Sequence, residues 1–261
     1  MASSYFQKIH HIVGLKCLTH PSWPGWALGL FIAPLILTIA RLSAETIILS
    51  VNVAYTIAFV VVACSIVGCA LACPNPRPRI TILIVFTAVI CLLGLKACAA
   101  HMHPLLQACL VTIALLAGGT SLGAWVGYRI ETPSHLLAVA VVSSLVDAFS
   151  VLHDAGPSAQ IAQSAEMLSL LALPWPMLGT ADLIPVIGVG DVVFAALYVG
   201  ACRVHRLSLV RTCVALSCGF LLTLVALFVF VRPIPALPFL GMCIVIAHPQ
   251  ARSLFNRKQH H

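Results

Sequence analysis

Two aspartates lie inside long hydrophobic segments of a chain that contains only seven acidic residues. Asp147 lies within the apolar run 134–153, and Asp191 lies within the run 183–201. A carboxylate that faced lipid at the bilayer centre would cost about 2.5–3.5 kcal/mol, so each side chain should face a protein interior or an aqueous cavity. No Lys or Arg lies centrally in either run. The two carboxyl groups are therefore each other's best candidate partner.

Two neighbouring carboxyl groups can share one proton, because two negative charges at close range cannot both persist. In an aspartic protease, one carboxylate takes a proton from water as the water attacks a peptide carbonyl, and the protonated partner donates to the developing oxyanion. A proton relay or an ion-binding site in a transporter would use the same two residue types. Asp147 and Asp191 alone do not distinguish a protease from a transporter.

The neighbouring sequence favours irregular backbone at membrane depth. Gly188 and Gly190 precede Asp191 at alternate positions, which removes side chains from one strip of backbone and permits extended or positive-φ conformations. Three prolines lie within 233–238, at the start of the last apolar run. Proline resists regular helix, and non-helical backbone is tolerated in a membrane only where it is buried in protein or lines an aqueous cavity. Simple punctuation at a helix start is the alternative explanation for the prolines.

The composition requires a membrane. The 261 residues are 61% hydrophobic and 8% charged, with a mean hydropathy of +1.07, whereas soluble domains have about a quarter charged residues. This composition excludes a soluble enzyme, a disordered tail and a nucleic-acid-binding domain. The net charge of +7 is better explained by orientation in a lipid bilayer than by binding of nucleic acid.

Eight apolar runs approach the length of about 20 residues that a helix needs to cross the bilayer. They lie near residues 24–40, 46–72, 80–97, 104–128, 134–153, 183–201, 208–231 and 234–248. The sequence therefore predicts an all-α polytopic transmembrane helix bundle of eight or nine spans. Its parts are a cytoplasmic segment (1–23), a four-span scaffold (24–130) and a second half (131–261) that holds both aspartates. The first run is expected to be a retained helix and not a cleaved signal peptide.

On this segmentation, eleven basic side chains fall on one side of the membrane and three on the other. The eleven are Lys8, Lys16, Arg77, Arg79, Arg129, Arg203, Arg206, Arg211, Arg252, Arg257 and Lys258, and the three are Arg41, Lys96 and Arg232. The positive-inside rule places the larger group, and both termini, in the cytoplasm. The connection 154–182 contains no Lys or Arg and is expected outside. The short loops favour a prokaryotic cytoplasmic membrane.

Two other motifs favour structural explanations. Cys98, His101 and His103 could present a thiol and two imidazoles to a metal, but their spacing fits no established zinc pattern, so no metal is predicted. Gly119 and Gly123, together with Gly127, place one small residue per turn on a single helix face. This stripe predicts close packing of another helix within the bundle and is less well explained as a dimer motif.

In combination, the motifs resemble those of the GxGD intramembrane aspartyl proteases, the family of signal peptide peptidase and presenilin. Three family motifs occur in the family's order: Val146-Asp147, Gly188-Val-Gly-Asp191, and Pro235-Ala236-Leu237 followed by Pro238. The resemblance covers roughly 134–248. The chain differs in having Val146 where the family has an aromatic residue, and in having four predicted spans, where the family has five, before the span of the first aspartate.

The resemblance implies that Asp147 and Asp191 are the catalytic pair and that Gly188 and Gly190 shape the active site. It implies that Pro235, Ala236, Leu237 and Pro238 help to receive substrate. Family members hold an unwound substrate helix as an extended strand, which the segment 183–189 would accept. The implied partners are transmembrane helices or remnant signal peptides with a cytoplasmic N-terminus. No cofactor beyond water is implied, and a homo-oligomer is left open.

Three alternatives remain beside this interpretation. Prepilin peptidases also use a Gly-x-Gly-Asp motif, but a lysine normally follows it, whereas Val192 and Val193 follow here. A proton-coupled transporter would be favoured by internal repeats, and the sequence contains none that we recognise. A catalytically inactive homologue that only binds membrane helices would carry the same motifs.

Overall fold

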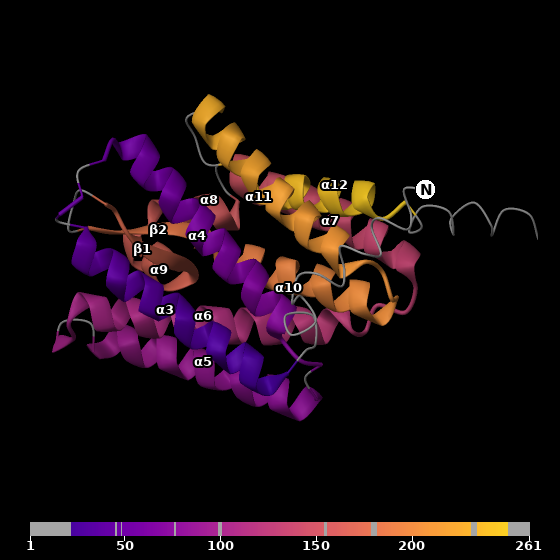
Figure 1. The fold of residues 1–261 in the computed structure, drawn as a ribbon, viewed down its shortest axis with the longest axis horizontal. Helices are drawn as coiled ribbons and strands as arrows, with labels where there is room; N and C mark the ends of the chain where they lie inside the picture. Colours follow the sequence, from indigo (N-terminus) through magenta and orange to yellow (C-terminus); the bar gives the residue numbers. More distant parts are fainter. Residues whose placement is uncertain are drawn as a thin grey trace, which may run out of the picture.

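The computed structural model describes residues 22–44, 46–47, 49–75, 77–98, 101–153, 156–178, 182–230 and 234–249 (Figure 1). The elements in chain order are α3 (Trp23–Ser43), α4 (Val51–Ala72), α5 (Pro78–Cys98), α6 (Pro104–Gly127), α7 (Pro133–Leu152), α8 (Pro157–Gln163), α9 (Ala165–Leu171), β1 (Ala172–Pro176), β2 (Leu183–Gly188), α10 (Val189–Val204), α11 (Leu209–Phe230) and α12 (Leu237–Ala247). The molecule is a helix bundle, as predicted, with a small antiparallel sheet that the all-α prediction missed.

Within the described residues, six helices are long and apolar enough to cross a membrane: α3, α4, α5, α6, α7 and α11. The protein is therefore an integral membrane protein. Proline lies in the first turn of α3, α5, α6, α7 and α12, where its fixed φ suits the helix and its missing N–H costs nothing. The remaining two predicted runs form shorter helices: α10 has 16 residues and α12 has 11.

Three predicted runs begin later as helices than the hydropathy indicated. The run 46–72 forms one unbroken helix, as predicted, but α4 starts only at Val51. The run 183–201 divides into the strand β2 and the helix α10. The run 234–248 becomes helical only at Leu237, because residues 234–236 are not helical. Hydropathy indicates which segments prefer an apolar medium, but it does not distinguish a buried helix from a buried strand.

The described part of the connection 154–182, which was predicted as a loop, is mostly helix and strand. It contains α8, α9 and β1, and Met177 N–H donates to the carbonyl oxygen of Asp182 at 2.9 Å where the chain turns back into β2. Leu173 and Trp175 on β1 are only 2% and 4% exposed. Strand β1 packs against α3, α4 and α6. The apolar residues of this connection therefore fold back onto the bundle.

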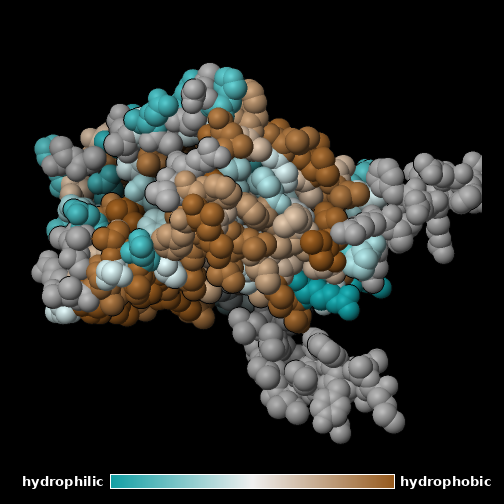
Figure 2. Space-filling model, turned by 90° about the horizontal axis from the view of Figure 1, so that it is seen from above, coloured by the Kyte–Doolittle hydropathy of each residue, from teal (hydrophilic) through white to brown (hydrophobic). Residues whose placement is uncertain are grey.

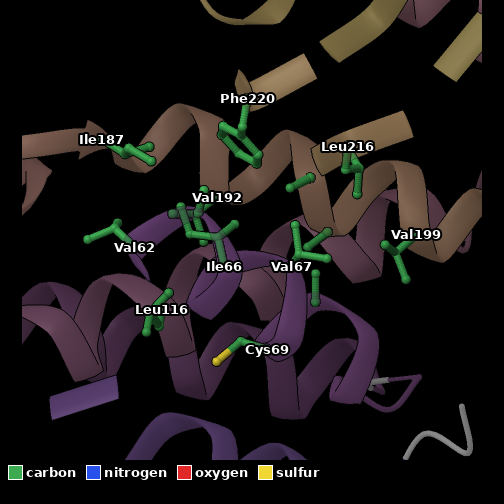
Figure 3. Close-up of a cluster of buried hydrophobic side chains, with 14 of the residues drawn as sticks. Val62, Ile66, Val67, Cys69, Leu116, Ile187, Val192, Val199, Leu216 and Phe220 are labelled. Atoms are coloured by element: carbon green, nitrogen blue, oxygen red, sulfur yellow. The ribbon is translucent and has the colours of Figure 1, made fainter. Parts of the chain in front are cut away.

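The helix α10 forms the centre of the bundle, between α6 on one side and α7, α11 and α12 on the other (Figure 1). Its buried residues are Val192, Ala195, Ala196, Leu197, Tyr198, Val199, Gly200, Ala201 and Cys202. Figure 3 shows two of them, Val192 and Val199, among apolar side chains from α4, α6, β2 and α11. Since the sides of α10 are covered by protein, the helix can be too short to span a bilayer, and it can carry an acid that does not face lipid.

The glycine stripe of α6 faces α10, which confirms the predicted packing within the bundle. A Cβ added at Gly123 would lie 2.9 Å from the Cβ of Ala196 and closer still to the carbonyl oxygen of Val193. A Cβ at Gly127 would meet the backbone of Leu197. Glycine is therefore required for the two backbones to approach this closely.

The outer faces of the bundle are apolar. Large side chains on α3, α5 and α7 point outward, and Phe31, Phe86 and Phe149 are each more than 60% exposed. Figure 2 shows apolar residues over the middle of one face, with the strongly hydrophilic residues toward its rim. Such a surface is stable in lipid, where apolar side chains lose nothing by exposure.

Three helix C-termini meet at one end of the bundle. The Arg203 guanidinium donates to the carbonyl oxygen of Cys73 at 2.6 Å, and also to that of Leu71, so the end of α10 caps the end of α4. A Cβ at Gly200 would lie 3.1 Å from the carbonyl oxygen of Ala124, which places the end of α6 beside them. The basic residues that follow these helices therefore share one end of the molecule. Lys8, Lys16, Arg232, Arg252, Arg257 and Lys258 lie outside the described residues.

Candidate functional site

Asp147 on α7 anchors the start of α12. Its Oδ2 accepts a hydrogen bond from the backbone N–H of Leu237 at 3.0 Å, and the N–H of Ala236 also bonds to this carboxyl group. The first N–H groups of a helix have no acceptor within the helix, and a negative charge there interacts favourably with the helix dipole. The Asp147 carboxylate thus satisfies the amides of the Pro-Ala-Leu segment. The structure places this segment beside Asp147.

Asp191 lies in the first turn of α10, two residues after Val189 begins the helix. Its carboxyl group accepts a hydrogen bond from the backbone N–H of Gly188, the N-cap residue. This is the return half of a capping box, in which an acidic side chain at the third helical position reaches back to the N-cap amide. The local sequence therefore holds the Asp191 carboxylate at the helix N-terminus.

The two glycines before Asp191 have different roles. Gly188 is extended, with φ −73° and ψ 156°, as predicted. Gly190 is already helical, because α10 begins at Val189, so the extended backbone ends one residue earlier than the predicted segment 183–189. A Cβ at Gly190 would meet no atom within 4 Å. The position that a side chain at residue 190 would occupy is therefore open space.

The structure brings Asp147 and Asp191 together, and the charge of Asp147 acts on Asp191. Nearby, the hydroxyl groups of Ser143 on α7 and Tyr198 on α10 are 3.5 Å apart, and both side chains are buried. This pair joins the two aspartate-bearing helices one turn from Asp147 and about two turns from Asp191. Residues 44 positions apart in the chain thereby form one polar site in an apolar bundle.

The strand β2 runs directly into Gly188 and Asp191. It pairs antiparallel with β1, with Ala172 opposite Gly188, and the sheet has only these two strands among the residues described. Pro174 and Pro176 occupy alternate positions of β1, and proline within a sheet is confined to the edge that donates no hydrogen bond. Strand β2 contains one proline, Pro185, which lies opposite Pro174. The outer edge of β1 therefore lacks two N–H donors and β2 lacks one, and β2 has no second strand partner among the residues described.

The remaining predicted site residues lie around the start of α12. Pro235 and Ala236 are buried, and Pro238 is partly buried in the first turn of the helix. Val146, which stands where the resembling family has an aromatic residue, is 61% exposed. Its side chain is therefore not part of the buried core of the bundle.

The histidines near Cys98 have a local explanation. His103 is the N-cap residue of α6, and its Nδ1 accepts from the backbone N–H of Leu105 at 3.3 Å. Across the described ranges, no group of three His, Cys, Asp or Glu side chains is arranged to hold a metal ion.

Sequence reasoning missed Ser144, which lies one turn before Asp147 on the same face of α7. Its Oγ is 3.3 Å from the carbonyl oxygen of Leu237, so it contacts the same residue as Asp147. The spacing of three residues between a hydroxyl and an acid in an apolar helix was the available signal.

This arrangement can perform proton-transfer chemistry. Two carboxyl groups that lie near each other can hold one proton between them, so that one acts as base and the other as acid. The amides of Leu237 and Gly188 hold each group in place by hydrogen bonds that do not require a cation. Comparisons of the chain with protein-family models, with curated proteins and with solved structures found no match. Function is therefore inferred from the geometry of these residues.

Proposed function

We propose that the protein is an intramembrane aspartyl endopeptidase that cleaves transmembrane helices or remnant signal peptides. The observation that carries this proposal is the meeting of Asp147 and Asp191 at the point where the amide of Leu237 binds Asp147. A pair of acids that served only to cap helices would have no need to lie near each other, because like charges repel.

In the proposed reaction, the ionised carboxylate removes a proton from a water molecule as the water oxygen adds to the substrate carbonyl carbon. The protonated carboxyl group donates its proton to the carbonyl oxygen, which produces a neutral tetrahedral diol. The diol then collapses: its nitrogen receives the proton that the first carboxylate took from water, one of its hydroxyl groups gives a proton to the other carboxylate, and the C–N bond breaks. The products are a carboxyl group and an amine, and the acid pair again holds one proton. The two acids titrate as a pair, so neither role is assigned to Asp147 or to Asp191 alone.

A substrate helix must be unwound before its amide can be attacked, because the helix shields the peptide groups by hydrogen bonding. The edge of β2 that has no strand partner among the described residues can bind the unwound segment as a third strand, with Pro185 as the one position that donates no hydrogen bond. Since β2 leads into Asp191, a strand paired with it would run toward the two acids. The open space at Gly190 leaves room for its backbone.

The protein is proposed to lie in a prokaryotic cytoplasmic membrane, with the basic end of the bundle and both termini on the cytoplasmic side. The clustering of the helix ends that precede Arg77, Arg129 and Arg206 supports this orientation through the positive-inside rule. The preferred substrates would then have a cytoplasmic N-terminus.

The test is cleavage of labelled transmembrane peptides by the purified protein in detergent, with the products identified by mass spectrometry. We expect Asp147→Asn and Asp191→Asn each to abolish internal cleavage. Glu131→Gln is the matched control, because it makes the same chemical change at an exposed loop position and should cleave normally. Repetition in vesicles, with peptides of both orientations, tests the orientation.

Cleavage that survives either aspartate substitution would refute the acid pair. If the wild-type protein cleaves nothing, binding of a hydroxyl-containing transition-state mimic would indicate an inactive homologue. Proton-coupled uptake by sealed vesicles would instead indicate a transporter.

A further inference from the structure

Both backbone groups of Leu237 are bound by α7. Its N–H donates to Oδ2 of Asp147 at 3.0 Å, and its carbonyl oxygen lies 3.3 Å from Oγ of Ser144. Ser144 and Asp147 are three residues apart, so they lie on one face of the helix. Together they hold a single residue of the Pro-Ala-Leu segment at two points.

The hydroxyl of Ser144 has two acceptors. Its Oγ lies 2.6 Å from the carbonyl oxygen of Ala140, the usual acceptor for a serine within a helix, and 3.3 Å from that of Leu237. One hydrogen serves both, so Ser144 links the backbone of α7 to that of α12. The longer of the two contacts is the one that crosses between helices.

The helix interface around Ser144 is closely packed. A Cβ added at Gly241, one turn after Leu237, would lie 3.2 Å from Oγ of Ser144 and 3.2 Å from the Cβ of Ala140. A contact this tight shows that α7 and α12 pack directly against each other at that level. The partly buried hydroxyl of Ser144 therefore has protein acceptors on both helices.

We propose that Ser144 is a positioning residue for the reaction: it holds Leu237 so that the Leu237 amide keeps Oδ2 of Asp147 engaged and directs the second carboxylate oxygen toward Asp191. This inference rests on the proposed protease function for its catalytic meaning. The geometry of the clamp, formed by Ser144, Asp147 and Leu237, stands independently of that function. Loss of the hydroxyl leaves one of the two contacts and lets the start of α12 move against Asp147.

The test combines hydrogen exchange with kinetics on the full-length protein in detergent. In Ser144→Ala, we expect the Leu237 amide to exchange about five to ten times faster, which corresponds to the loss of about one net hydrogen bond. We expect kcat to fall by about the same factor with a smaller change in KM, because a carboxylate is misplaced and the β2 edge is untouched. Ser144→Thr retains a hydroxyl and should restore both values toward the wild type.

Ser65→Ala is the matched control. Ser65 makes the same type of bond within its helix, to the carbonyl oxygen of Val61 at 2.9 Å, on α4 away from the acids. It should change neither measurement. Two results together would indicate general destabilisation and would overturn the positioning role. They are faster exchange throughout α12 in Ser144→Ala and an equal loss of kcat in Ser65→Ala.

Unchanged exchange at Leu237 in Ser144→Ala would overturn the clamp whatever the kinetics show. A third outcome is faster exchange of the Leu237 amide in Ser144→Ala while the wild-type protein cleaves no peptide. This result would refute the protease function, and with it the catalytic role of Ser144, whereas the clamp itself would stand.

Discussion

Replacement of Gly123 by alanine should separate the two helices that position Asp191. The new Cβ would lie 2.9 Å from the Cβ of Ala196, whereas ordinary contacts begin at 3.4 Å, and it would lie closer still to the carbonyl oxygen of Val193. Helices α6 and α10 must therefore move apart by at least about 0.5 Å. Backbone cannot rotate away as a side chain can, so the strain is distributed over the helix that carries Asp191.

The magnitude follows from a comparison with Gly68→Ala on α4, where a Cβ meets no atom within 4 Å. Alanine favours a helix over glycine by about 1 kcal/mol, and this gain is common to both variants. Overpacking costs about 1–3 kcal/mol and applies only to Gly123→Ala. The two variants should therefore differ by about 1–3 kcal/mol in the free energy of unfolding.

Thermal unfolding in detergent, followed by circular dichroism, measures this difference. For a chain of this length, each kcal/mol corresponds to about 2–4 °C in Tm. Under the proposed function, displacement of Asp191 should also lower peptide cleavage by Gly123→Ala more than its fraction of folded protein explains. Equal Tm values for Gly123→Ala and Gly68→Ala would refute the close packing of α6 against α10.

Three other predictions concern single contacts of the scaffold. Arg203→Met should lower the free energy of unfolding by about 1.5–3 kcal/mol, because it removes charge-assisted hydrogen bonds to the carbonyl groups that end α4, whereas Arg79→Met, at an exposed position, should have little effect. Thr120→Val should cost about 1–3 kcal/mol, because the buried indole N–H of Trp26 loses its acceptor at 3.1 Å. Burial, and then the charge of a neighbouring arginine, lower the pKa of His248, just beyond the end of α12; the unfolded chain therefore binds the proton more readily, and stability should be lost as the pH falls through about 6.5. In His248→Gln this acid sensitivity should be reduced.

Each of these predictions is checked by unfolding in detergent, the last over a series of pH values. A Tm for Arg203→Met equal to that of Arg79→Met would contradict the capping role of the guanidinium. An unchanged Tm in Thr120→Val would show that the indole finds another acceptor. An acid limb of the stability profile that is identical with and without the imidazole would assign the pH dependence to other groups.

Much of the bundle could be predicted from hydropathy, since six of the eight apolar runs are helices of membrane-spanning length. The strand at Leu183–Gly188 could be anticipated only as non-helical backbone, because its side chains are as apolar as those of a helix. Strand β1 was not anticipated at all. Pro174 and Pro176 argue against a central strand, and only the pairing with β2 makes their positions acceptable.

The candidate site shows the same division. Asp147, Asp191 and the Pro-Ala-Leu segment could be selected from the sequence, because charge is costly in lipid and proline interrupts helices. Ser144 could not be selected in the same way, because a serine in an apolar helix can satisfy its hydroxyl within its own turn. Its second contact depends on where α12 lies.

The sequence by itself determined that the chain enters a membrane, which segments are apolar, and which few acids must be sheltered from lipid. These properties follow from the transfer free energies of individual residues and need no knowledge of neighbours in space. Only the tertiary structure decided that α10 lies at the centre, that the carboxylates meet, and that the amide of Leu237 binds Asp147. Those outcomes depend on how closely helices approach, and the side chains absent at Gly123, Gly127 and Gly241 set that approach through contacts between distant parts of the chain.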